Sequence, residues 1–272
     1  ETTQTKNVTT TRELPSTAPT DEEGFTATPT PEITGPVAFT DGETAYRERK
    51  YTEATKIFET YTTQKPDNAW GHFMFGLSAS KSGDSTKAEK GFEGALAIDP
   101  DHFKSLTNLS RVLIEQKRYD DALDKLMHAG DVDPTSNEVY RLMGRAYHAK
   151  GQAEEAVTSY RRAIELDEKD VWSMNNLGLL FLETKRAEEA LPLLVKAVEL
   201  KKDVPAFHNN LGMALEHTGR FGAAATAYAG ALTADPTYEK ARQNLTRVEG
   251  VKKDFEEPFD FEKEGDDAAG SR

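Results

Sequence analysis

The chain has 272 residues, with 34 Lys and Arg against 47 Asp and Glu, and a formal net charge of −13 at pH 7. This acidic balance argues against general binding to nucleic acid or anionic membranes, because phosphates repel a negative surface. The absence of cysteine excludes a disulfide scaffold, a thiolate zinc site and a cysteine nucleophile. No apolar run approaches the ~18 residues that a membrane-spanning helix needs.

Residues 1–34 differ in composition from the rest of the chain, with twelve threonines and four prolines. Such a segment cannot bury enough apolar surface to offset its ordering entropy, so we predict a Thr/Pro-rich extended arm. Arms of this kind occur as linkers and as glycosylated stalks. The candidate glycosylation positions are Asn7, which begins an Asn-Val-Thr triplet, and Thr9, Thr10 and Thr11.

From residue 35 onwards the sequence has a helical pattern that repeats every 34 residues. An alanine recurs at this spacing, a large side chain follows it by four residues, and glycine or serine precedes it by twelve. Small residues on two helices permit close approach, and the large residue fills the gap between them. The alanines are Ala54, Ala88, Ala122, Ala156, Ala190 and Ala224; the large residues are Phe58, Phe92, Leu126, Tyr160, Leu194 and Tyr228; the small residues are Gly42, Gly76, Ser110, Gly144, Gly178 and Gly212.

These positions resemble the tetratricopeptide repeat (TPR) family over six units of 34 residues, or 204 of the 272 residues. The resemblance implies an all-α fold, a right-handed α-solenoid of six helix-turn-helix repeats. A single unit cannot bury its apolar face, so stability comes from the stacking of neighbours. Unit 1 departs from the pattern, because Asp41 stands where the other units have a large apolar residue. The units are 35–68, 69–102, 103–136, 137–170, 171–204 and 205–238.

Two further segments follow the repeats. Residues 239–253 are predicted to hold a capping helix that covers the last unit, because terminal repeats need a polar outer face. Residues 254–272 form an acidic aromatic tail with eight acidic and two basic residues. The candidate docking residues of this tail are Phe255, Phe259 and Phe261.

The sequence contains no recognisable catalytic arrangement. The six histidines form no His-Glu-x-x-His pair or other tight metal-ligand spacing, and there is no glycine-rich phosphate loop. We therefore predict a protein that is not an enzyme, with no catalytic residue, no metal and no cofactor.

The resemblance also implies a concave groove lined by the first helix of each unit. In this family, asparagines on that face bond the backbone of an extended peptide, which suits an amide because it carries both a donor and an acceptor. Basic residues in adjacent units attract acidic groups, and tryptophans are typical binding anchors. The predicted groove residues are Trp70, Phe73, Leu77, Lys104, Asn108, Arg111, Arg141, Arg145, Trp172, Asn176 and Asn210.

Each groove feature has a structural alternative. Asparagine is common at this position in ordinary repeats, the basic residues could pair with Glu115 and Glu138, and the tryptophans could pack between repeats. Cochaperone members of the family clamp a C-terminal carboxylate with a Lys/Asn/Lys/Arg set. This sequence does not match that set in consecutive units, so the resemblance does not extend to chaperone binding.

We predict a non-enzymatic scaffold that binds an extended peptide or a partner arm in the groove. The alternative is a structural subunit of a larger assembly, such as a surface filament or an accessory subunit of a membrane complex, docked through the arm and the tail; a homo-oligomer is one form of it. Because the sequence begins at Glu1, we also consider a removed signal peptide or an upstream lipid anchor. A bacterial periplasmic or cell-surface location is then favoured over a cytoplasmic one.

Overall fold

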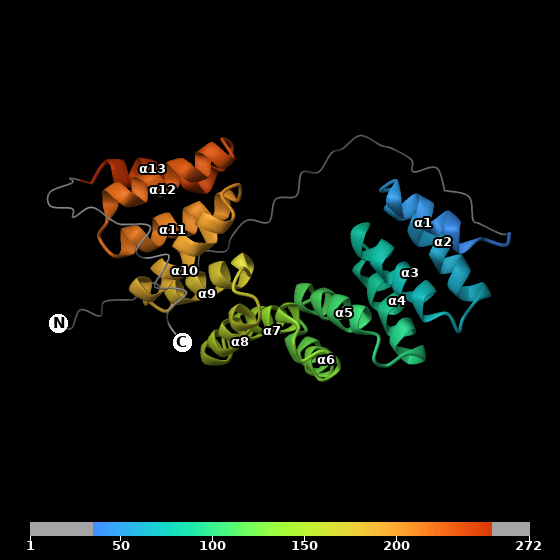
Figure 1. Ribbon diagram of the computed structural model, residues 1–272. Coiled ribbons are helices and arrows are strands. Elements are labelled where there is room, and N and C mark those ends of the chain that lie inside the picture. Colours follow the sequence, from blue (N-terminus) through green and yellow to red (C-terminus); the bar gives the residue numbers. More distant parts are fainter. Residues whose placement is uncertain (1–34, 252–272) are drawn as a thin grey trace, which may run out of the picture. The chain divides into compact units, whose positions relative to one another are not determined.

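The computed structural model describes residues 35–251, which form thirteen helices and no strand (Figure 1). The predicted arm with Asn7, Thr9, Thr10 and Thr11, and the predicted tail with Phe255, Phe259 and Phe261, lie outside the described residues. The helices are α1 (Phe39–Arg47), α2 (Tyr51–Gln64), α3 (Ala69–Lys81), α4 (Ser85–Ile98), α5 (Phe103–Glu115), α6 (Tyr119–Val132), α7 (Asn137–Lys150), α8 (Ala153–Leu166), α9 (Val171–Glu183), α10 (Ala187–Leu200), α11 (Pro205–His217), α12 (Phe221–Ala234) and α13 (Glu239–Glu249).

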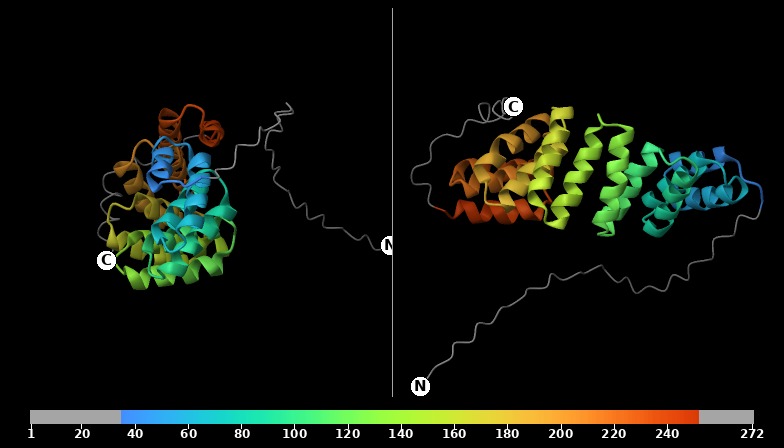
Figure 2. Two further views of the ribbon diagram at one scale, coloured as in Figure 1. Left: turned by 90° about the vertical axis from the view of Figure 1, so that its right-hand side faces the viewer. Right: turned by 90° about the horizontal axis from the view of Figure 1, so that it is seen from below.

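The helices pack in chain order. Each odd-numbered helix contacts the even-numbered helix that follows it, and each even-numbered helix contacts the next odd-numbered one. Figures 1 and 2 show this succession from α1 in blue to α13 in red. Contacts that join only neighbouring units are the hallmark of a repeat stack, so the predicted all-α solenoid is confirmed. The helix α13 lies within the range 239–253 predicted for a cap.

The contact inside each helix pair joins the small and the large repeated residue. A Cβ atom added at Gly144 of α7 would lie 2.5 Å from Cδ1 of Tyr160 in α8, and Tyr160 is only 1% exposed. Glycine is needed here because the two helices approach too closely for any side chain. The same contact joins Gly42 to Phe58, Gly76 to Phe92, Gly178 to Leu194 and Gly212 to Tyr228, whereas unit 3 has the buried pair Ser110 and Leu126.

The turn inside each unit uses one residue with positive φ. Glycine supplies it in units 2, 4 and 6, where Gly83, Gly151 and Gly219 have φ near 80°. A basic residue supplies it in units 1, 3 and 5, at Arg49, Lys117 and Lys185, with φ of 61° to 62°. An L-residue in this conformation carries a strain of roughly 1–2 kcal/mol. The turns therefore alternate between an unstrained and a strained form along the stack.

The departure at Asp41 has a structural reason. No described unit precedes unit 1, so the side of α1 that carries Asp41 has no neighbour to pack against among residues 35–251. The Asp41 carboxylate accepts a hydrogen bond from the backbone N–H of Ala38 at 3.1 Å. Asp41 thus caps the first helix, where a carboxylate also suits the positive end of the helix dipole.

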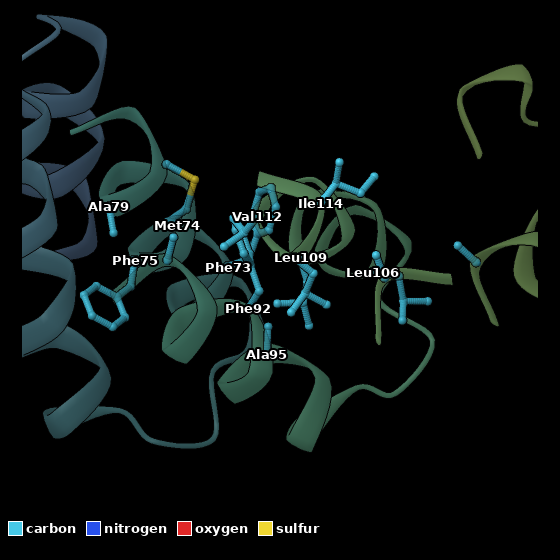
Figure 3. Packing of buried hydrophobic residues seen from close by; sticks show 14 of the residues in the cluster. Phe73, Met74, Phe75, Ala79, Phe92, Ala95, Leu106, Leu109, Val112 and Ile114 are labelled. Carbon is cyan, nitrogen blue, oxygen red and sulfur yellow. The ribbon is translucent and has the colours of Figure 1, made fainter. Parts of the chain in front are cut away.

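Buried apolar side chains connect neighbouring units. One cluster runs from unit 1 to α7, another from α8 to α13, and Tyr147 packs against both. Figure 3 shows Phe73 and Phe92 of unit 2 beside Leu106 and Leu109 of unit 3. Because the core crosses each boundary between units, a unit is stable only with its neighbours.

Candidate functional site

One side of the stack is lined by the odd-numbered helices. From α3 to α13 these helices contact one another in succession, whereas successive even-numbered helices are not in comparable contact. The helices that approach more closely lie on the inner side of a stack, so we call the odd-numbered side the inner face. All eleven predicted groove residues come from these helices, namely α3, α5, α7, α9 and α11.

The two tryptophans occupy equivalent places in units 2 and 5 and are partly exposed. Trp70 is 41% and Trp172 is 45% exposed. Each indole ring also contacts an aromatic ring, Trp70 that of Phe73 at 4.9 Å and Trp172 that of Phe207 at 5.1 Å between centroids. Each tryptophan therefore packs against another ring of the stack and stays partly exposed, so part of each indole is available to a ligand.

A lysine ammonium covers each tryptophan. Nζ of Lys104 lies 5.1 Å from the ring centroid of Trp70, and Nζ of Lys201 lies 5.0 Å from that of Trp172. These are cation–π contacts. Phe73 differs from its prediction, because it is 4% exposed and its ring packs against Phe92 as well as Trp70. Phe73 belongs to the core and packs against Trp70. Leu77 is half-buried.

Two of the three arginines among the predicted groove residues, Arg111 and Arg141, are engaged by acidic residues. Arg111 pairs with Glu138 of the next unit, one of the two acids named as structural alternatives; no salt bridge to the other, Glu115, is present among residues 35–251. Arg141 donates to both oxygens of Asp170 at 3.0 Å. The Asp170 side chain is 1% exposed and also caps α9, so Arg141 is held in place by the fold.

Arg145 is the arginine of this group that remains available. It is exposed and forms no salt bridge with any residue in the range 35–251. Burial raises the pKa of the Tyr160 phenol, and the nearby Arg145 charge lowers it, which places the guanidinium close to this ring. Asn176 also lies near Tyr160 and lowers the pKa of its phenol slightly. Beside them, Nε2 of His148 lies 2.6 Å from the Glu183 carboxylate.

The asparagines on the inner face bond mainly to one another. Nδ2 of Asn210 donates to Oδ1 of Asn175 at 2.9 Å, and Nδ2 of Asn244 donates to Oδ1 of Asn209 at the same distance. This asparagine ladder joins α9, α11 and α13. Asn108 instead donates to the carbonyl oxygen of its own helix at Lys104 and accepts from Arg111. The amide donors of Asn108 and Asn210 are therefore partly used within the protein.

The described residues contain no cluster of side chains suited to binding a metal ion. No group of three His, Asp or Glu side chains in residues 35–251 is placed to hold a metal ion. His102 caps α5 and His128 contacts Asp101, so both histidines have local structural partners. No helix in the same range is long and apolar enough to cross a membrane.

These features define a helical-repeat protein whose odd-numbered helices line one extended face. Three family models match the chain: a TPR repeat model covers residues 144–185, and two tetratricopeptide repeat models cover 175–239 and 79–146. The chain is a tetratricopeptide repeat protein. Proteins of this family act as protein-interaction scaffolds and are generally not catalytic.

Curated and solved relatives agree with this assignment. The chain is 34% identical over 95 residues to human tetratricopeptide repeat protein 7B. The aligned segment covers 35% of this chain and 11% of that protein. Among solved structures it is similar to one chain of the APC/C hetero-tetramer Cut9–Hcn1, with a TM-score of 0.65 and 18% identity; the match covers 76% of this chain and 41% of that chain. It is also similar to YrrB, described as a TPR protein with an unusual peptide-binding site, with a TM-score of 0.54, 17% identity and coverage of 71% and 99%. At these identities the solved structures support the fold alone.

Proposed function

We propose that this protein is a non-enzymatic scaffold whose inner face binds an extended, acidic segment of a protein partner. The observation that carries the proposal is Arg145, an exposed cation without a carboxylate partner among residues 35–251. It lies in unit 4, between the partly exposed tryptophans of units 2 and 5. One cation flanked by two aromatic edges suits a peptide with an acidic group between apolar side chains.

Three kinds of contact would hold such a segment. Arg145 would donate charge-assisted hydrogen bonds to a carboxylate, which contribute roughly 1.5–3 kcal/mol each. The free edges of Trp70 and Trp172 would cover apolar side chains at either end. Asn176 would use its remaining hydrogen-bonding capacity on the peptide backbone, which requires no particular sequence. A peptide-binding site on the structurally similar YrrB is consistent with this proposal.

A calorimetric titration tests the role of Arg145. The probe is the synthetic peptide EDFEEDFEED, and its lysine counterpart KKFKKKFKKK is the charge control. We expect Arg145→Glu to weaken binding of the acidic peptide about 10- to 100-fold, which corresponds to the loss of one charge-assisted contact. The matched control is Arg161→Glu, another exposed arginine, on α8 and outside the inner face. Equal losses in both variants would reject the site, since only net charge would then matter.

The acidic tail of this chain is itself a candidate ligand for the inner face of a second copy, which is a second form of the proposed function. Residues 254–272 carry eight acidic and two basic residues around Phe255, Phe259 and Phe261, which matches the ligand chemistry inferred for the inner face. In this form the tail of one copy occupies the inner face of another and builds a homo-oligomer. Light scattering of the intact chain and of the Arg145→Glu variant tests it. An equal mass for both would rule out this use of the tail.

A further inference from the structure

The large repeated residue is a tyrosine in units 4 and 6, at Tyr160 and Tyr228. The other units have phenylalanine or leucine at this position, so packing against the small residue requires no hydroxyl group. Tyr160 is 1% and Tyr228 is 0% exposed, and a buried tyrosine usually finds a hydrogen-bond partner for its hydroxyl. The partner of each hydroxyl is therefore a separate property of these two units.

In unit 6 the phenol and an arginine hold a carboxylate of the chain itself. The Tyr228 hydroxyl donates to Oε2 of Glu216 at 2.8 Å, and the Arg247 guanidinium pairs with Oε1 of the same side chain. The Glu216 side chain is 14% exposed, so its carboxylate lies largely within this contact. Because Glu216 belongs to α11, a phenol at this repeat position reaches the inner-face helix of its own unit.

In unit 4 the equivalent hydroxyl has no acceptor. The repeat position of Glu216 is taken by His148, whose Nε2 instead contacts the Glu183 carboxylate at 2.6 Å. No residue in the range 35–251 accepts a hydrogen bond from Tyr160. The fully buried side-chain polar atoms that lack a partner in this range belong to other residues, so the Tyr160 hydroxyl is accessible at the surface.

Arg145 supplies the second donor group in unit 4. It is exposed, follows Gly144, against which the Tyr160 ring packs, and forms no salt bridge with any residue in the range 35–251. The charges of Arg145 and Glu183 both act on the pKa of the Tyr160 phenol, which places these groups close together. Glu183 is already bound by His148. Unit 4 therefore has the phenol and the guanidinium of unit 6 without a carboxylate between them.

We propose that the Tyr160 hydroxyl and the Arg145 guanidinium together bind one side-chain carboxylate of the partner segment, as unit 6 binds Glu216. This inference rests on the proposed function of the inner face and adds to it a binding residue from an even-numbered helix, α8. One carboxylate oxygen accepts from the phenol and the other from the guanidinium. A carboxylate suits the site better than a phosphate dianion, because one arginine faces the phenol and Glu183 adds negative charge beside it.

Two matched tyrosine variants test the proposal by calorimetry. The probe is EDFEEDFEED with an amidated C-terminus, so that side chains supply every carboxylate. We expect Tyr160→Phe to weaken binding about tenfold, because it removes one hydrogen bond to a charged group. Tyr228→Phe makes the same change where Glu216 already uses the hydroxyl, and it should bind like the parent. Both variants keep the packing, because phenylalanine already occupies this position in units 1 and 2.

The outcomes separate this inference from the proposed function. If Arg145→Glu weakens binding more than Arg161→Glu does, but Tyr160→Phe and Tyr228→Phe bind equally well, the inference is wrong and the proposed function stands. If the peptide does not bind the parent protein, both are wrong. The double variant Arg145→Gln with Tyr160→Phe should show a loss that differs about twofold or more from the product of the two single losses. A loss equal to that product would assign the two groups to different carboxylates and overturn the inference.

Urea unfolding gives the readout that a purely structural role of Tyr160 would move. Tyr228→Phe should lower the urea midpoint, because Glu216 loses the hydrogen bond from the phenol. Tyr160→Phe should keep the midpoint of the parent, because no residue in the range 35–251 accepts from its hydroxyl. An equal decrease of the midpoint in both variants would show that the Tyr160 hydroxyl is used within the protein, and would overturn the proposal.

Discussion

Replacing Gly144 by alanine tests the packing inside a helix pair. The new Cβ atom would meet Cδ1 of Tyr160 at 2.5 Å and Cε1 at 2.6 Å, and Tyr160 is 1% exposed, so its ring cannot turn into solvent. Overpacking of this kind costs about 1–3 kcal/mol. Alanine in place of glycine inside a helix returns about 0.5–1 kcal/mol. The two effects oppose each other, so a control for helix propensity is needed.

Gly130→Ala is that control. Gly130 also lies inside a helix, α6, but a Cβ atom there would meet its nearest neighbour, Cγ1 of Val139, at an ordinary 3.7 Å. We expect this variant to gain about 0.5–1 kcal/mol from helix propensity alone. In urea unfolding followed by circular dichroism, Gly144→Ala should therefore be about 1–3 kcal/mol less stable than Gly130→Ala. Equal stability of the two variants would refute the close-packing account.

A rescue experiment sharpens this prediction. Unit 3 already uses serine and leucine, Ser110 and Leu126, where unit 4 uses Gly144 and Tyr160, and both are buried. The double variant Gly144→Ser with Tyr160→Leu should be more stable than the sum of the two single changes, with a coupling of about 1 kcal/mol or more. Additive effects would show that the small and the large residue do not share one space.

Three further outcomes are expected. Asp170→Ala should cost about 3 kcal/mol in urea unfolding, because it removes a carboxylate that is 1% exposed and paired, whereas Glu165→Ala in an exposed pair should cost about 0.5 kcal/mol or less. Burial raises the pKa of Tyr160 and Tyr228 above the ordinary tyrosine value, so the protonated phenols favour the folded state. The free energy of unfolding should therefore be highest below pH ~10 and fall as the pH rises further. Phenylalanine variants should show a smaller fall. Asn209→Ala should cost about 1–2 kcal/mol and speed hydrogen exchange in α13, because it removes the acceptor that α13 uses; unchanged exchange would contradict the asparagine ladder.

Much of the fold could be predicted because its determinants recur at one spacing. The 34-residue period places a small residue opposite a large one, and this contact depends only on local sterics within a unit. The strained turns at Arg49, Lys117 and Lys185 were not predictable in the same way, since no glycine marks them. Only their place in the repeat, shared with the glycines of the other units, could have identified them.

The availability of the groove residues could not be read from the sequence. Whether an arginine is free depends on partners that are remote in the chain. Arg111 pairs with Glu138 of the next unit, and Arg141 pairs with Asp170, which caps α9. The asparagine ladder has a similar origin, because its members pair with an offset of one residue from the repeat period. A repeat alignment shows equivalent positions, whereas these bonds join non-equivalent ones.

The central claim, that an acidic segment binds across the inner face, is tested most directly by intrinsic fluorescence. The chain has two tryptophans, Trp70 and Trp172, and both lie partly exposed on that face. Titration with EDFEEDFEED should change the emission of both, as shown by the variants Trp70→Phe and Trp172→Phe, with the affinity found by calorimetry. Binding by calorimetry without any change in tryptophan emission would contradict the account, because the peptide would then lie away from the inner face.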